Sequence, residues 1–249
     1  MKPGYHFSID DVFDSLLMVS DWRLRPHAQP FFAFCAEIAA EGAVTDLYLF
    51  RSSRGMDGRT RRLDEAATPA TADAFSNFRG VRFGPHAEDY ATAPHAQTLE
   101  AQTATMSGLF DTIARFTMPE SRSRWVRLHY FSECFEIAPV FLAVGVEALL
   151  TTDKPALTYR MDPEAAKNLR LKGRTEINNL AMIRSHLRLE NHVIEARDPA
   201  RFHARIDEAL DMHGFVTLFT HEIDMADERV RTLAHSSVRH LARCGIPAI

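Results

Sequence analysis

The stretch "YHFSIDDVFD", Tyr5 to Asp14, places two adjacent carboxylates, Asp10 and Asp11, directly after the apolar run of a buried strand. Two neighbouring carboxylates repel each other, so a fold that keeps both near its core usually provides a cation or a shared proton. The alternative is a helix N-cap followed by a second acid that complements the helix dipole. The rest of the chain has to decide between these two interpretations.

The composition is that of an ordinary globular protein. The 249 residues are 46% hydrophobic and 25% charged, with a formal net charge of −4, which fits a single domain over residues 1–249. Because no basic block is present, neither nucleic acid nor an anionic membrane is expected as a partner. No apolar run has the length of a membrane span, and no signal region is visible, so we expect a cytoplasmic protein.

The cysteines give no sign of a structural cross-link. Cys35, Cys134 and Cys244 are widely separated and form no C-x-x-C pair. This spacing predicts neither a disulfide scaffold nor a thiolate zinc site, and it favours a reducing compartment.

Apolar runs typical of buried strands alternate with segments of helical periodicity. The expected strands are residues 5–9, 44–50, 81–87, 125–131, 147–152, 156–160 and 215–222, and the expected helices are residues 30–42, 96–116, 135–145, 200–214 and 226–245. This alternation predicts an α/β fold with a parallel sheet covered by helices. About seven such strands without a linker favour one distorted (β/α) barrel, with residues 51–69 as a long surface loop.

Imidazole and carboxylate groups gather at the predicted carboxyl ends of these strands, where an α/β barrel carries its functional groups. These groups are Asp10, Asp11, His86, His129, Glu133, Asp153, His221 and Glu222. Imidazole and carboxylate are the ligands of zinc and similar divalent ions, and catalytic sites use three protein ligands plus water. The sequence therefore predicts one divalent metal ion, with zinc as the first candidate.

The same residues resemble the polysaccharide deacetylase, or NodB-homology, superfamily over nearly the whole chain. "SIDD" is similar to the family's strand ending T-F-D-D-G, and "LFTHE" is similar to its last strand, L-x-H. The resemblance implies a distorted (β/α) barrel that hydrolyses N- or O-acetyl groups on sugars. It implies that Asp10 is the catalytic base, that Asp11 binds the metal, and that His221 is the general acid.

The chain also departs from the family pattern. Val12 replaces the glycine after the paired acids, and the family's H-x-x-x-H has no match because Tyr90 stands four residues after His86. The R-x-P-Y strand is missing, with "RLHYF" in roughly its place. With these departures, the chain resembles a divergent branch of the family, of the sort associated with surface-polysaccharide biosynthesis.

The third metal ligand has to be chosen on chemistry. His129, at the end of the fourth strand, is the expected partner of Asp11 and His86, and His95 is its competitor. Glu222 or Asp153 is expected to orient the imidazole of His221. Glu133, Asp153 and Glu222 are otherwise candidates for a supporting or substrate-binding role.

Several residues have both a functional and a structural interpretation. Trp22, Tyr130 and Phe131 could stack against a sugar, although such aromatic side chains are more often part of a core. Arg184 and Arg188 could bind an anionic sugar group, although surface ion pairs are commoner.

Three functions compete. The first is a metal-dependent hydrolase that acts on an acylated sugar or oligosaccharide. The second is a degenerate, non-catalytic barrel that binds carbohydrate or a protein partner, which the missing motif residues favour. The third, a metal phosphodiesterase, requires more basic residues around the ion than the strand ends offer.

Overall fold

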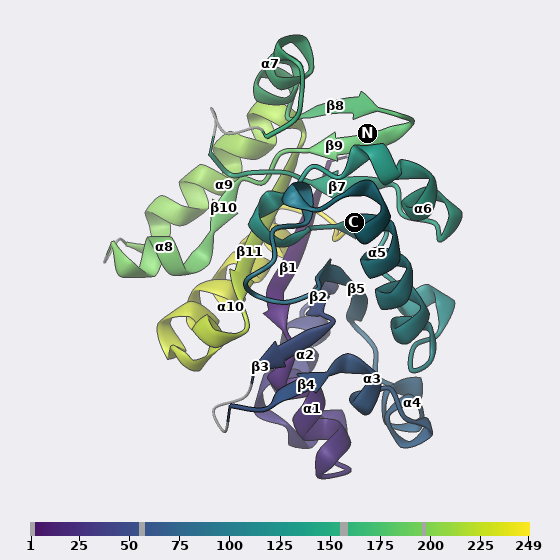
Figure 1. Cartoon of the computed structure of the whole chain (residues 1–249). Coiled ribbons are helices and arrows are strands. Elements are labelled where there is room, and N and C mark those ends of the chain that lie inside the picture. Colours follow the sequence, from purple (N-terminus) through teal and green to yellow (C-terminus); the bar gives the residue numbers. More distant parts are fainter. Residues whose placement is uncertain (1–2, 55–57, 155–158, 196–197) are drawn as a thin grey trace.

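The fold is built on a parallel sheet of five strands. The computed structural model describes residues 3–54, 58–154, 159–195 and 198–249 (Figure 1). The strand order is β10-β11-β1-β2-β5, and all neighbours are parallel. The strands are β1 (Gly4–Val12), β2 (Thr45–Phe50), β5 (Val81–Ala87), β10 (Leu187–Arg188) and β11 (Phe215–His221).

A second sheet of four strands has the order β6-β7-β9-β8. It consists of β6 (Trp125–Val126), β7 (Ala148–Leu150), β9 (Leu180–Ile183) and the antiparallel β8 (Arg174–Ile177). The segment 180–188 links the two sheets, because its first part pairs with β7 and its last part pairs with β11. On the other side, beside β5, the ladder shrinks to an isolated bridge between Phe83 and Arg122.

This topology confirms the α/β class with a parallel sheet covered by helices. The closure of about seven strands into one barrel stays a prediction. The helices are α1 (Asp14–Asp21), α2 (Pro30–Ala40), α3 (Leu63–Ala66), α4 (Pro69–Ser76), α5 (Leu99–Ala114), α6 (Ala138–Ala143), α7 (Pro163–Lys172), α8 (Leu189–Ile194), α9 (Pro199–His213) and α10 (Glu228–Arg243). In Figure 1, α9 and α10 lie on one side of β1 and β11, and α5 lies on the other. Among the described residues, no helix is both long and apolar enough to cross a membrane.

The structure corrects two of the expected elements. Residues 51–69 are not a plain loop, because β3 (Ser52–Arg54) and β4 (Thr60–Arg62) form an antiparallel pair that leads into α3. The expected strand 125–131 ends at Val126 and is followed by a 3₁₀ turn, His129–Phe131, in which Tyr130 and Phe131 have positive φ angles. The expected strand 156–160 falls largely outside the described residues.

β1 lies at the centre of the five-stranded sheet and is almost entirely buried, as parallel strands covered on both faces are. Its carboxyl end pairs with that of β11, so that Asp10 lies opposite His221. Since parallel strands end at the same edge, the groups at the ends of β1, β5 and β11 converge there.

Gly80 directly precedes β5, the strand that carries His86, and we expect a side chain at this position to destabilise the fold. Gly80 has φ +85°, and an added Cβ would lie 2.2 Å from Cβ of Ala39 in α2. Gly80→Ala should therefore lower the free energy of unfolding, measured by urea denaturation, by about 2 to 4 kcal/mol. Gly42→Ala is the matched control, because Gly42 has φ +93° and, apart from its chain neighbours, no described residue has an atom within 4 Å of the added Cβ. It should cost about 1 kcal/mol, the backbone strain alone, and equal losses would contradict the packing argument.

Candidate metal centre

The two adjacent acids line the same cavity because the end of β1 is bulged. In a regular strand, neighbouring side chains point to opposite faces of the sheet. Here the pairing of β1 with β2 shifts register between Ile9 and Val12, and Asp11 adopts a left-handed conformation with φ 60°. A bulge of this kind re-aims a side chain, and aspartate tolerates the conformation better than most residues. Asp10 and Asp11 therefore line one cavity.

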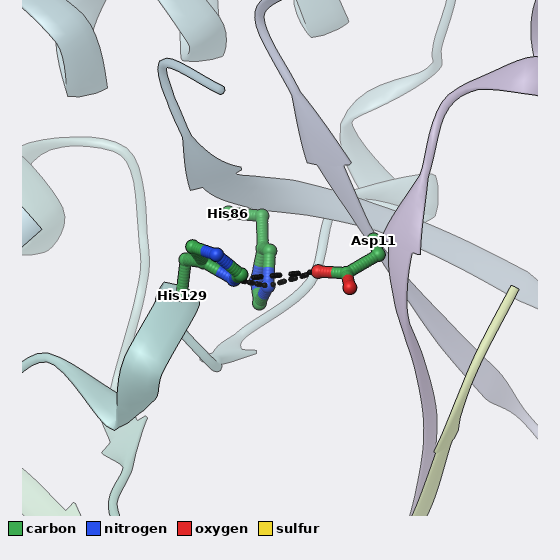
Figure 2. A group of neighbouring side chains, drawn as sticks. All are labelled: Asp11, His86 and His129. Atoms are coloured by element: carbon green, nitrogen blue, oxygen red, sulfur yellow. Dashed lines mark hydrogen bonds and ion pairs between the residues drawn. The ribbon is translucent and has the colours of Figure 1, made fainter. Parts of the chain in front are cut away.

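Asp11 meets two histidines in this cavity (Figure 2). Its Oδ1 lies 2.9 Å from Nε2 of His86, at the end of β5, and 3.4 Å from Nδ1 of His129, in the turn after β6. The two ring nitrogens are 3.2 Å from each other. These three atoms come from three separate parts of the chain and form a group able to hold a metal ion.

The hydrogen bonds of the two imidazoles decide which nitrogens carry protons. Nδ1 of His86 lies 2.7 Å from the carbonyl oxygen of Arg127, and Nε2 of His129 lies 2.9 Å from that of Tyr90. A carbonyl oxygen only accepts, so these nitrogens donate, and a neutral imidazole then presents a lone pair at its other nitrogen. Metal-ligating histidines are commonly fixed in this way.

When both imidazoles are neutral, three lone pairs converge on one point, and they repel one another unless a proton or a metal ion lies between them. Oδ1 of Asp11 is buried and, among the described residues, has no well-aligned hydrogen-bond partner, although Nε2 of His86 is only 2.9 Å away. One carboxylate and two imidazoles are a ligand set of catalytic zinc sites, which leave a further position open. The residues present therefore fit a divalent metal ion.

The carboxylate of Asp11 is held in its ionised form. Burial alone raises the pKa of Asp11, but the rings of His129 and His86, which donate to its carboxylate when they are protonated, and the positive charge of His221 outweigh burial and hold this pKa well below its usual range. An anionic ligand is what a divalent cation requires.

His95, the competing third ligand, lies apart from this group. Its Nδ1 lies 2.9 Å from Oγ of Ser132, and its ring stacks on Tyr159 at a centroid distance of 3.9 Å. The geometry therefore favours His129 over His95.

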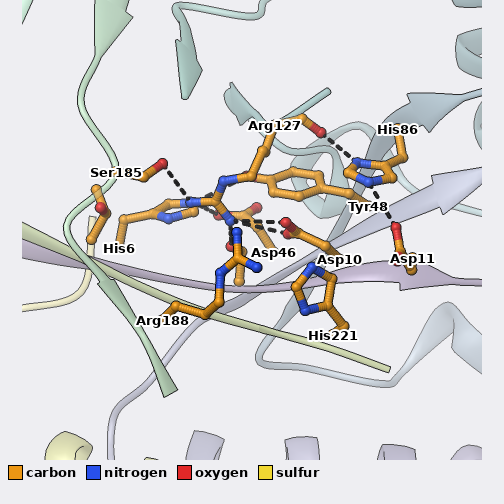
Figure 3. Close-up of polar contacts among 12 residues, drawn as sticks. His6, Asp10, Asp11, Asp46, Tyr48, His86, Arg127, Ser185, Arg188 and His221 are labelled. Atoms are coloured by element: carbon orange, nitrogen blue, oxygen red, sulfur yellow. Dashed lines mark hydrogen bonds and ion pairs between the residues drawn. The ribbon is translucent and has the colours of Figure 1, made fainter. Parts of the chain in front are cut away.

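Asp10 is paired with a buried arginine that sequence reasoning missed (Figure 3). The side chain of Arg127 is 1% exposed, and its Nη1 donates to Oδ1 of Asp10 at 3.0 Å and to Oγ of Ser8 at 2.6 Å. Its Nη2 donates to Oγ of Ser185 at 3.2 Å. The signal was available, because a charged residue inside the apolar run "WVRL" of an expected buried strand needs a buried partner.

The sequence Arg127-Leu128-His129-Tyr130 can now be compared with R-x-P-Y. It keeps the arginine and the tyrosine and has histidine where the family pattern has proline. The histidine in the proline position is the residue that joins Asp11 and His86.

His221 lies on the opposite side of the same cavity and is held by two acids. Its Nδ1 lies 2.8 Å from Oε1 of Glu190, in α8, and 3.3 Å from Oδ2 of Asp224. Burial alone lowers the pKa of His221, but the hydrogen bonds with Asp224 and Glu190 and the negative charges of Asp10 and Glu190 raise it to about 10. At neutral pH this residue is an imidazolium.

The prediction that Glu222 or Asp153 orients His221 is wrong. Glu222 accepts hydrogen bonds from the backbone N–H groups of Phe13, Asp14 and Ser15, so it caps the start of α1. Asp153 lies 3.7 Å from Nε of Arg188 instead. Glu190 and Asp224 contact His221 instead. The sequence around them contains no motif that would have indicated this role.

Glu133 is a buried anchor for a loop. Its Oε2 accepts hydrogen bonds from the backbone N–H groups of Tyr159, Arg160 and Met161, at 3.0 to 3.3 Å. Burial raises its pKa. Glu133 does not line the cavity of the cluster.

The cluster faces a small cavity that adjoins a larger groove. The cavity has a volume of about 190 Å³, and its wall includes Asp10, His221 and Arg188. The groove, of about 750 Å³, shares Asp11 and Tyr90 with it and extends along β3 and β4. A small group can therefore reach the cluster while the body of a larger molecule lies in the groove.

No protein-family model and no curated protein match the chain. Solved structures share its fold at low sequence identity. A CE4 esterase from Streptococcus mutans has a TM-score of 0.54 and 11% identity, with 99% of this chain and 85% of the esterase covered. A mutant of a CE4-family pseudoenzyme from Bacillus anthracis, with restored enzymatic activity, has a TM-score of 0.52 and 11% identity, with 99% and 65% covered.

The fold is not confined to CE4 proteins. The 4-α-glucanotransferase from Thermococcus litoralis has a TM-score of 0.55 and 11% identity, with 96% of this chain and 38% of the glucanotransferase covered. The chain thus spans less than two thirds of the length of this enzyme and of the pseudoenzyme. The comparisons confirm the resemblance to the NodB-like polysaccharide deacetylases, as a divergent branch, at the level of the fold.

We expect metal binding to depend on the three clustered residues. Asp11→Asn and His129→Gln should each weaken zinc binding by more than the roughly 10- to 100-fold that loss of a ligand's supporting partner costs. Metal content after dialysis, measured by mass spectrometry, tests this, with circular dichroism to confirm folding. His95→Gln is the control and should bind zinc as the wild type does. A folded wild type that takes up neither zinc nor cobalt would overturn the metal assignment.

Proposed function

We propose that this chain is a metal-dependent hydrolase that removes an acetyl group from an acylated sugar in surface-polysaccharide metabolism. The observation that carries the proposal is the convergence of Asp11, His86 and His129 on one point of a cavity that also contains Asp10 and His221. The shared fold with a CE4 esterase supports it. We propose zinc as the metal, and one distorted barrel as the frame.

Asp11, His86 and His129 would hold the metal. A divalent ion in such a site polarises an acyl carbonyl group and lowers the pKa of water toward neutrality. The carbonyl groups of Arg127 and Tyr90 keep the two imidazoles in the tautomers that binding requires.

Asp10 would act as the general base. Its carboxylate faces the cavity beside Asp11, and the guanidinium of Arg127 holds it in position from the buried side. Oδ2 of Asp10 lies 3.3 Å from Nη1 of Arg127, the nitrogen that also donates to Oδ1. Since each carboxylate oxygen has two lone pairs, Asp10 can still accept a proton from water. A general base contributes roughly 10²- to 10⁴-fold to the rate.

His221 would protonate the leaving amine or alkoxide. Its imidazolium form is stabilised by Glu190 and Asp224, so the proton is present at neutral pH. His221 and Asp10 project into the cavity from neighbouring strands (Figure 3). A base and an acid therefore flank the point where the acyl group would lie.

A non-catalytic barrel is the second candidate, and the likeness to a pseudoenzyme favours it. The charged groups oppose it. Taking charges out of water costs several kcal/mol per ion, and even a well-formed buried ion pair often adds no net stability over apolar side chains of the same size. Asp10 and Arg127 are both almost fully buried, and Asp11 adopts a strained left-handed conformation.

Activity should depend on Asp10. We expect the zinc-loaded wild type to release acetate from N-acetylated amino sugars or their oligosaccharides, and Asp10→Asn to lower kcat by about 10²- to 10⁴-fold. Acetate release by an enzyme-coupled assay measures this, and metal content confirms that the variant is still loaded. A loaded wild type that releases no acetate from a panel of acetylated sugars would favour the non-catalytic barrel.

The pH at which activity falls on the alkaline side should depend on the hydrogen bonds of His221 with Glu190 and Asp224. The imidazolium is lost only as pH rises through about 10, so His221 should not limit the rate between pH 7 and 9. Glu190→Gln keeps a hydrogen-bond acceptor but removes its negative charge, which should lower the pKa of His221 and shift the alkaline limb of kcat to lower pH by about one unit or more. Asp224→Asn should act in the same direction. An alkaline limb unchanged in both variants would exclude His221 as the group that loses its proton there.

A further inference from the structure

Arg188 lies in the wall of the small cavity, yet the mechanism above gives it no task. It is the last residue of β10, two positions before Glu190, and it shares the cavity wall with Asp10 and His221. Figure 3 shows its side chain reaching from the strand toward Arg127 and Asp10. A cation therefore lies beside the proposed reacting groups.

The neighbours of Arg188 fix its position without using its hydrogen-bond donors. Its Nε lies 3.6 Å from Oε1 of Glu190 and 3.7 Å from Oδ2 of Asp153, both beyond hydrogen-bonding distance. This Nε is buried and, within the described parts of the chain, has no hydrogen-bond partner. The guanidinium carbon lies 5.5 Å and 5.0 Å from the ring centroids of Phe131 and Phe219, which is a stacking arrangement.

A second guanidinium stacks on the same ring. The guanidinium carbon of Arg127 lies 4.1 Å from the Phe219 centroid. Arg127 donates to Asp10, Ser8 and Ser185, whereas the acids nearest to Arg188 among the described residues lie 3.6 and 3.7 Å away. Two guanidinium groups at one ring repel unless anions lie close, and within the described parts of the chain Arg127 has a carboxylate at hydrogen-bonding distance whereas Arg188 does not.

We propose that Arg188 binds a carboxylate on the acylated sugar, so that the substrate is an N-acetylated amino sugar acid. This inference rests on the proposed function and deepens it. The planar guanidinium offers pairs of parallel N–H donors that match a carboxylate.

The charge and size of the site favour a carboxylate over a phosphate. Asp10 and Asp11 already line the cavity, and Glu190 and Asp153 flank Arg188, so a dianion would meet more repulsion than a monoanion. The cavity of about 190 Å³ leaves room only for a small group next to the reacting centre. The carboxylate would therefore be a substituent of the same sugar ring.

The test compares two substrates that differ only at one carbon. N-acetylglucosamine carries a hydroxymethyl group where N-acetylglucosaminuronic acid carries a carboxylate. With zinc-loaded wild type, we expect kcat/KM for acetate release to be about 10- to 100-fold higher for the uronic acid, as for a hydrogen bond to a charged group. Arg188→Gln should abolish this preference, and Arg188→Lys should keep only part of it, because lysine lacks the planar fork. Arg184→Gln is the matched control and should preserve the preference, since Arg184 does not line this cavity.

A binding measurement keeps the proposal testable if neither sugar is hydrolysed. Glucuronate should bind the zinc-loaded wild type more tightly than glucose in calorimetry, and Arg188→Gln should remove the difference. Equal kcat/KM for both acetylated sugars, or a carboxylate preference that survives in Arg188→Gln, would overturn the inference and leave the proposed function intact. Failure of acetate release with a retained, Arg188-dependent preference for glucuronate would instead count against the proposed function alone.

Discussion

The site depends on one buried guanidinium. Arg127 is the largest fully buried side chain of the described residues, and its donors reach Asp10 and Ser8 in one sheet and Ser185 in the segment that joins the two sheets. Its backbone carbonyl oxygen accepts a hydrogen bond from Nδ1 of His86. Breaking a buried ion pair typically costs about 3 to 5 kcal/mol because it leaves an uncompensated charge. The same residue therefore holds the two sheets together, positions the proposed base and sets the tautomer of a proposed metal ligand.

Much of the fold could be predicted from the sequence because it is encoded in local patterns. Long apolar runs marked β1, β2, β5 and β11, and helical periodicity marked α2, α5, α9 and α10 to within a few residues. The failures have a common physical cause. "RLHYF" has the composition of a strand, but the positive φ angles of Tyr130 and Phe131 turn the chain toward Asp11. Residues 51–69 are polar, yet backbone pairing and a network of surface charges order β3 and β4.

The candidate site was predictable where its residues stand at strand ends, as Asp10, Asp11, His86 and His221 do, or shortly after one, as His129 does. It was not predictable where a contact depends on the path of the chain between distant segments. Glu190 reaches His221 across 31 residues, and Glu222 reaches the start of α1 across more than 200. An acid next to a histidine in the sequence is therefore not necessarily the one that orients it. His221 contacts Glu190, whereas its sequence neighbour Glu222 binds the backbone at the start of α1.

The pairing of β1 with β11 has a consequence for how the protein is made. β1 leaves the ribosome before its neighbour β11, which carries His221, precedes the glutamate that caps α1, and follows about two hundred residues later. Contacts between such distant segments form slowly, because the entropy of closing a long loop must be overcome first. The five-stranded sheet cannot be completed before β11 has been synthesised. The reactive centre is thus assembled only once β11 has emerged, and translation products that stop before β11 lack His221.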